Sequence, residues 1–209
     1  MWRPGNHRRR DHCRLLRAPA SGRKREDSGS GWWRLLLVSE RVYSVLFLCT
    51  GNSARSIIAE TLLNAMGKGR FRAYSAGSHP SGRINPYVAE YLESVGVSTS
   101  GARSKSWDEF ARPDAPKMDL VITVCDQAAG EVCPVWPGMP AKAHWSAPDP
   151  AMHMEQPEKV REVARDVFHL MRRRISMLLS LPMATLDRMS LQSQTRRIAD
   201  ETRTASTSV

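Results

Sequence analysis

Short apolar runs alternate with segments of helical periodicity between residues 42 and 180. The runs predict four strands: Val42–Cys49, Phe71–Ser75, Asp119–Cys125 and Ala141–Trp145. The periodic segments predict four helices: Ser56–Met66, Asn85–Val95, Trp107–Ala111 and Pro157–Ser180. The third strand is almost continuously apolar, which is typical of a central strand covered on both faces. Strands that alternate with helices predict an α/β fold with a four-stranded parallel sheet and helices on both faces.

Residues 1–40 and 182–209 lack this pattern and flank one predicted domain at residues 41–181. The first segment is rich in Arg, Gly and Ser, and its apolar cluster Trp32–Val38 is too short and interrupted for a signal peptide. The last segment is rich in Ser, Thr and Arg. Segments of this composition bury too little apolar surface to offset the entropy lost on ordering, so we predict that both are disordered.

The net charge of +10 is concentrated in the first segment, where ten Arg or Lys residues face four Asp or Glu residues. The predicted domain is close to neutral, so the high pI does not indicate nucleic-acid binding. No apolar stretch is long enough to suggest a membrane partner. The chain has four cysteines and no secretory signal, which favours a reducing cytoplasm in which cysteines perform chemistry.

The first predicted strand leads Cys49 into a loop of small and polar residues that ends at Arg55, where a helix begins. Backbone N–H groups in such a loop converge on a tetrahedral oxyanion, and an arginine adds a planar fork. The predicted oxyanion-binding residues are Thr50, Gly51, Asn52, Ser53, Ala54, Arg55 and Ser56. We expect these surroundings to place the pKa of Cys49 well below the ordinary thiol value of about 8.5. A buried structural cysteine is the alternative, but it explains neither the glycine nor the arginine.

The motif Cys49-x5-Arg55-Ser56, with Gly51-Asn52 inside it, resembles the signature loop of the low-molecular-weight tyrosine phosphatase superfamily. That superfamily includes the thioredoxin-coupled arsenate reductases. The resemblance covers roughly residues 42–180 and implies a phosphatase-like α/β fold.

Cys49, Cys125 and Asp149 each follow a predicted strand, at the sheet edge where open parallel sheets bind ligands. The family pattern implies that Asp149, which precedes Pro150, is the general acid that protonates the leaving oxygen. Phosphatases of this group usually continue with tyrosines, whereas Ala151-Met152-His153 follow here, which counts against phosphotyrosine.

Cys125 and Cys133-Pro134 form the second informative element. Reduction of arsenate takes two electrons, the number that two thiols release in forming a disulfide. The flanking residues resemble the thioredoxin-coupled arsenate reductases, although the spacing between the two cysteines is one residue longer than in better-known members. The resemblance implies that Cys49 attacks arsenate, that Cys125 then attacks the Cys49 sulfur, and that Cys133 resolves the disulfide for thioredoxin or a similar carrier to reduce.

The sequence offers two candidate metal sites. A zinc site would use Cys125, Cys133, His144 and His153, but the close Cys-x2-Cys spacing is missing. Asn52, Glu60 and Ser75 resemble positions that hold potassium in some of these reductases, but Ser106 stands where the completing carboxylate is expected. We therefore expect no metal and no cofactor. The two later cysteines could also be inert small hydrophobic residues.

The sequence thus favours an arsenate reductase that uses a three-cysteine disulfide relay. The alternative is a low-molecular-weight phosphatase that hydrolyses phosphate monoesters with Cys49, Arg55 and Asp149 alone. A third possibility is an oxyanion-binding module without catalysis, which the retention of nucleophile, arginine and acid disfavours. Arsenate and phosphate are nearly isosteric, so the loop by itself does not choose between them.

Overall fold

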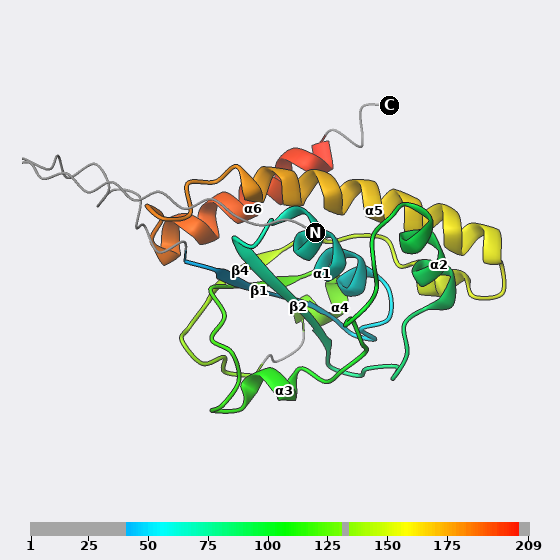
Figure 1. Cartoon of the computed structure of the whole chain (residues 1–209), viewed down its shortest axis with the longest axis horizontal. Helices are drawn as coiled ribbons and strands as arrows, with labels where there is room; N and C mark the ends of the chain where they lie inside the picture. Colours follow the sequence, from blue (N-terminus) through cyan, green and yellow to red (C-terminus); the bar gives the residue numbers. More distant parts are fainter. Residues whose placement is uncertain (1–40, 131–133, 205–209) are drawn as a thin grey trace, which may run out of the picture. The chain divides into compact units, whose positions relative to one another are not determined.

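The computed structural model describes residues 41–130 and 134–204. The extension predicted for residues 1–40 lies outside the described residues, as does Cys133. Four parallel strands form one sheet in the order β2-β1-β3-β4 (Figure 1). The strands are β1 (Tyr43–Cys49), β2 (Phe71–Gly77), β3 (Leu120–Thr123) and β4 (Ala141–His144). The predicted four-stranded parallel sheet is therefore confirmed.

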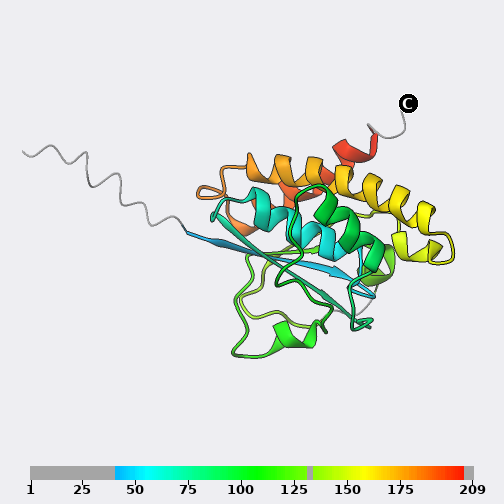
Figure 2. The same cartoon turned by 45° about the vertical axis from the view of Figure 1, so that its right-hand side comes forward.

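Helices cover both faces of the sheet, as predicted (Figure 2). The helices are α1 (Arg55–Met66), α2 (Pro86–Ser94), α3 (Asp108–Ala111), α4 (Asp126–Gly130), α5 (Pro157–Leu179) and α6 (Arg188–Thr204). Buried residues of α1, α2, α5 and α6 form the larger core on one face, while α3 and the segment around Trp136 cover the other face. No helix within the described residues is both long and apolar enough to cross a membrane.

Strand β1 is the centre of both cores. Val45 and Phe47 point into the larger core, whereas Leu46 and Leu48 point into the smaller one, and all four side chains are fully buried. Because side chains alternate along a strand, a strand between two cores must be apolar at every position. The uninterrupted apolar run that ends in Cys49 thus places the cysteine at the carboxyl edge of the sheet.

The tail at residues 182–209 was expected to be disordered, but residues 188–204 form helix α6. Its buried side chains lie at helical spacing: Leu191, Thr195, Ile198, Ala199 and Thr202. Thr195 and Thr202 donate their hydroxyls to carbonyl groups of their own helix, so they pack as small core residues. The segment is mostly polar, so its composition did not indicate the narrow stripe of buried side chains along one face of the helix. This stripe is sufficient for packing against β4 and α5.

Two side chains from the preceding elements fix α6. The buried indole of Trp145 donates to Thr195 O (2.9 Å). Arg174 of α5 donates to Thr202 Oγ1 (2.9 Å) and to Ser146 O (2.8 Å). Burial lowers the pKa of Arg174 to about 10, so the guanidinium remains charged at neutral pH. A buried charge needs its hydrogen-bond partners, and α6 supplies one of them.

The packing of α6 predicts that a buried and an exposed substitution in this helix have different effects on the free energy of unfolding. Ile198 is 3% exposed and Met189 is 77% exposed. Ile198→Ala should lower the free energy of unfolding by about 2 to 5 kcal/mol, because it leaves a cavity in the core. Met189→Ala, the matched control, should change it by no more than about 0.5 kcal/mol. Urea denaturation measures both values, and equal effects would show that α6 does not pack on the sheet.

Candidate active site

The carboxyl ends of β1 and β3 bring Cys49 and Cys125 to the same place. Val124 N donates to Leu48 O (2.8 Å), so the chain stays paired with β1 beyond the end of β3. Both cysteines are buried free thiols. Thr50 Oγ1, in the loop after Cys49, lies 3.6 Å from Cys125 Sγ. Of the three predicted relay cysteines, Cys125 therefore contacts the loop that begins at Cys49, while Cys133 falls outside the described residues.

The loop after Cys49 is held by Asn52. This residue has a φ of 42°, in the left-handed region that asparagine tolerates better than most residues. Its backbone N–H donates to Cys49 Sγ (3.1 Å). Its side-chain nitrogen donates to Ser56 Oγ (2.9 Å) and Ser75 Oγ (2.8 Å), and its Oδ1 accepts from Lys105 N (2.8 Å). Every polar group of the Asn52 side chain is thus engaged in holding the loop.

Gly77, at the end of β2, allows this loop to pass close to the sheet. A Cβ atom there would lie 2.3 Å from Thr50 O and 3.1 Å from Asn52 N. Such contacts are far shorter than van der Waals distances, so any side chain at residue 77 would displace the loop. The sequence shows only a glycine after a strand, and its role depends on the approach of a loop distant in sequence.

Arg55, the first residue of α1, contacts the predicted acid directly. Its guanidinium forms an ion pair with Asp149 Oδ2 and donates to Ala147 O (3.4 Å). Asp149 Oδ1 accepts from Ala151 N (3.0 Å), which caps a short 3₁₀ turn over Pro150–His153. The arginine and the acid, far apart in the sequence, therefore lie at one site beside the Cys49 loop.

The electrostatic surroundings of Cys49 differ from the expectation drawn from the sequence. Burial raises the pKa of Cys49 above its ordinary value, and the hydrogen bond with Ser56 (2.9 Å) and the charge of Arg55 oppose this shift without cancelling it. The expected low pKa is therefore wrong for this structure. The sequence motif indicates which groups favour the thiolate, but it does not show how completely the sulfur is removed from water or that Arg55 also pairs with Asp149.

The helix after Cys125 is fixed by His144. Thr123 Oγ1 lies 2.8 Å from His144 Nδ1, and His144 Nε2 lies 3.0 Å from Asp126 Oδ1 at the start of α4. Hydrogen bonds from Ser146 and His144 lower the pKa of Asp126. None of the helices predicted from the sequence covers residues 126–130, so the sequence analysis did not identify this short helix. Within residues 41–130 and 134–204, no three His, Cys, Asp or Glu side chains are grouped to hold a metal ion.

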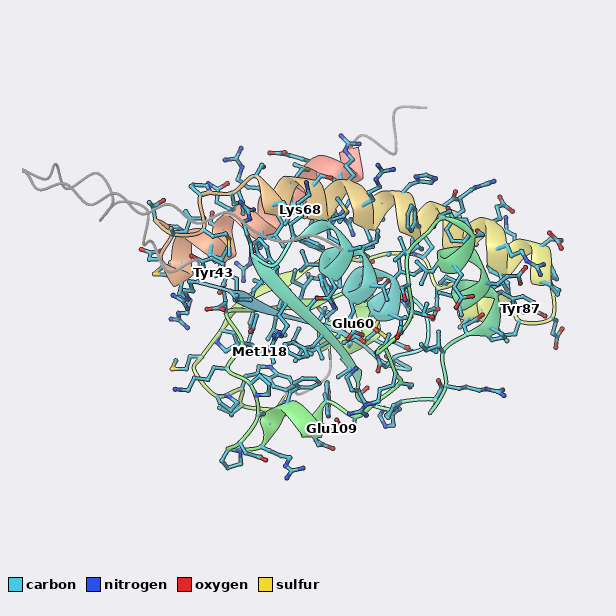
Figure 3. All side chains as sticks on the ribbon, in the orientation of Figure 1. Tyr43, Glu60, Lys68, Tyr87, Glu109 and Met118 are labelled. Atoms are coloured by element: carbon cyan, nitrogen blue, oxygen red, sulfur yellow. The ribbon has the colours of Figure 1, made fainter. Side chains whose placement is uncertain are left out.

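The three residues that resemble a potassium site lie together behind the loop. Glu60, labelled in Figure 3, projects from α1 and accepts a hydrogen bond from Ser75 Oγ (2.6 Å). Asn52 turns its NH₂ group, not its carbonyl, toward Ser75. Lys105 Nζ lies 3.8 Å from Glu60 Oε1, and both side chains are buried. A metal cation requires oxygen lone pairs, so this donor set, with an ammonium group beside it, does not fit potassium.

The buried cysteine predicts a measurable reactivity profile. Iodoacetamide reacts with the thiolate, so the midpoint of Cys49 alkylation against pH should lie above about 8.5 in the ligand-free protein. Ser56→Ala should raise the midpoint further, because the Ser56 hydroxyl lowers the pKa. Ser176→Ala, at an exposed position on α5, is the control. Peptide mass spectrometry identifies the alkylated cysteine, and a midpoint below 8.5 would mean that Arg55 outweighs burial.

Comparison with known proteins places this geometry in a family. Residues 44–190 match the low molecular weight phosphotyrosine protein phosphatase family. The chain is 36% identical over 107 residues to the arsenate reductases of Halalkalibacterium halodurans and Bacillus subtilis, covering 51% of this chain and 73% of each relative. A solved arsenate reductase in the phosphate binding state has a TM-score of 0.51 and 28% identity, over 64% of this chain and 97% of that chain. The chain therefore belongs to the low molecular weight phosphotyrosine protein phosphatase family, within which it is similar to arsenate reductases.

Proposed function

We propose that this protein reduces arsenate to arsenite, with Cys49 as the nucleophile. The strongest support is the second buried thiol beside the loop: Cys125 Sγ lies 3.6 Å from Thr50 Oγ1. Phosphate-ester hydrolysis uses one thiolate, whereas the reduction uses two thiols to supply two electrons. The similarity to proteins named arsenate reductases supports the same substrate.

Arsenate binds the N–H groups of the loop that contains Asn52 and the guanidinium of Arg55. In the ligand-free structure this guanidinium pairs with Asp149. The arriving oxyanion competes for Arg55, and this exchange leaves the Asp149 carboxyl free to carry a proton. The loop amides and the guanidinium stabilise the negative charge that develops on the oxyanion.

The reaction then proceeds in balanced steps. The Cys49 thiolate bonds to arsenic, and an arsenate oxygen leaves as water after receiving a proton from Asp149. The Cys125 thiolate attacks the Cys49 sulfur, so that a sulfur–sulfur bond forms and the sulfur–arsenic bond breaks. The electron pair of the broken bond stays on arsenic, which leaves as arsenite. Cys133 then exchanges with the Cys49–Cys125 disulfide to give a Cys125–Cys133 disulfide.

We further propose that thioredoxin or a similar thiol carrier of the cytoplasm reduces the final disulfide. A reducing compartment keeps the three thiols available for each turnover. The activity resides in the part of the chain from residue 41 to residue 204, because the sheet and its covering helices lie there.

A phosphatase reaction is the second candidate. It is favoured by the direct contact between Arg55 and Asp149, which provides an oxyanion clamp and an acid without Cys125. In this reaction Cys49 forms a phosphoryl-enzyme intermediate that water hydrolyses. Rapid hydrolysis of p-nitrophenyl phosphate without arsenite release from arsenate would favour this reaction.

Substitution of each cysteine separates the two reactions. Cys133→Ser should release about one arsenite per enzyme and then stall as a Cys49–Cys125 disulfide, because the first two thiols supply the two electrons. Cys125→Ser should lose carrier-coupled turnover but keep any phosphatase activity, whereas Cys49→Ser should lose both. Arsenite release and peptide mass spectrometry of the disulfide are the measurements. Full multiple turnover by Cys125→Ser would refute the relay.

Arg55→Lys tests the oxyanion clamp. Lysine keeps the charge but loses the planar fork, so kcat/KM for arsenate should fall by about 100-fold or more. Arg72→Lys, at an exposed position on β2, should leave kcat/KM unchanged. The assay is arsenate-dependent NADPH oxidation with thioredoxin and thioredoxin reductase. A near-normal value for Arg55→Lys would remove Arg55 from the site.

A further inference from the structure

A cavity of about 540 Å³ lies at the outer edge of the sheet. Strand β4 is the last strand in the sheet order, and α6 packs beside it, so the cavity is enclosed between this edge and the C-terminal helix (Figure 1). Helix α4 and Trp136 complete the wall. None of the described residues that line the cavity belongs to the Cys49 loop, so it is separate from the candidate active site.

The inner wall of the cavity is apolar and is built from small side chains. Helix α4, strand β4 and helix α6 contribute alanines to it: Ala128, Ala129, Ala143 and Ala199. A methyl group extends little from the backbone, so three elements that meet here leave space between them. A volume of this size is within the range of about 300 to 1,000 Å³ that is typical of small-molecule sites, whose walls are mostly apolar.

Trp136 belongs to the same wall and is 3% exposed. Its indole N–H has no hydrogen-bond partner in the part of the chain that the structure describes. Buried polar groups are nearly always paired, because an unpaired one loses its hydrogen bonds to water without replacement. The wall of this cavity therefore contains a donor that the described fold leaves unsatisfied.

The charged residues of the wall leave an excess of positive charge. Asp200 lies 4.0 Å from Arg203, so these two side chains balance each other. Lys142 and Arg196 also line the cavity, and neither forms an ion pair with another described residue. The cavity thus carries two cations whose charge is not balanced by a neighbouring carboxylate.

These two cations lie close to the contact between β4 and α6. Lys142 N donates to Gln192 Oε1 (3.4 Å), and Gln192 and Arg196 are one helical turn apart on α6. Both side chains are exposed, so they stand where a ligand enters, while the alanines lie on the other parts of the wall.

The cavity depends on a helix that the family match does not include. The match covers residues 44–190, whereas Arg196, Ala199, Asp200 and Arg203 lie beyond it. One side of the cavity is therefore supplied by a segment outside the shared catalytic domain.

We propose that this cavity is a second ligand site, which binds a small organic anion with an apolar body. The anionic group pairs with Lys142 and Arg196, and the apolar body packs against the alanines and Trp136. The size of the cavity, its apolar inner wall and its unbalanced cations together select this class of ligand. The proposal is independent of the reaction at Cys49.

The experiment compares two fluorescent probes on the full chain. Anilinonaphthalene sulfonate is an aromatic anion, and phenylnaphthylamine has the same ring system without the sulfonate. The anion should bind saturably and at least about 10-fold more tightly than the neutral compound, because the two cations stabilise only a charged ligand. Inorganic phosphate, added at constant ionic strength until it slows Cys49 alkylation by iodoacetamide, should not displace the anion.

Substitutions at exposed positions locate the binding. Arg196→Ala and Lys142→Ala should each weaken binding of the anion by about 5-fold and leave binding of the neutral compound unchanged. Arg197→Ala, the matched control, removes the neighbouring arginine, which is not among the lining residues, and should change neither. Ala129→Leu adds volume on α4 and should weaken both compounds by at least about 10-fold, because it fills the cavity. Urea denaturation of each variant verifies that it is folded.

Several results would overturn the proposal: no saturable binding of the anion, equal affinity for the two probes, displacement of the anion by phosphate, or binding of the anion that survives both Arg196→Ala and Ala129→Leu. None of these measurements uses arsenate turnover. A protein that does not reduce arsenate would give the same readouts, so failure of the proposed function is distinguishable from failure of this site.

Discussion

The hydrogen bonds of Asn52 are the constraint on which the geometry of the loop after Cys49 depends. One residue in the left-handed region directs its N–H to the Cys49 sulfur and uses its side chain to tie the loop to Ser56, Ser75 and Lys105. A left-handed non-glycine residue costs free energy and persists only where several contacts determine it. The loop is therefore preformed around the sulfur, which is the arrangement that the proposed oxyanion site requires.

Charge balance around this loop is arranged in two layers. In the partly exposed layer, Arg55 pairs with Asp149, and their opposite charges balance each other. On the inner side, Lys105 pairs with Glu60 and is shielded from water. The pair of Arg55 with Asp149 is partly exposed, whereas the pair of Lys105 with Glu60 is buried. This arrangement suits the proposed site, in which Arg55 and Asp149 take part in the reaction while Glu60 and Lys105 support the loop.

The C-terminal helix α6 packs on the same face of the sheet as α1 and α5, and it supports the segment that follows β4. Trp145 and Arg174 connect β4 and α5 to α6, and the segment that follows β4 leads to Asp149. The position of the acid thus depends on packing by a helix whose sequence is mostly polar. This dependence extends the folded domain to residue 204 rather than to residue 181.

The sequence by itself determined the sheet and the family to which the loop after Cys49 belongs. The strand that ends in Cys49 is apolar from Val45 onward, and the loop that follows carries its own local signature, so neither required knowledge of distant contacts. The family resemblance drawn from that loop is confirmed. Tertiary structure alone decided three features: the raised pKa of Cys49, the packing of α6 and the ion pair of Glu60 with Lys105. Each depends on residues far apart in the chain, because burial and pairing are set by what the fold brings together.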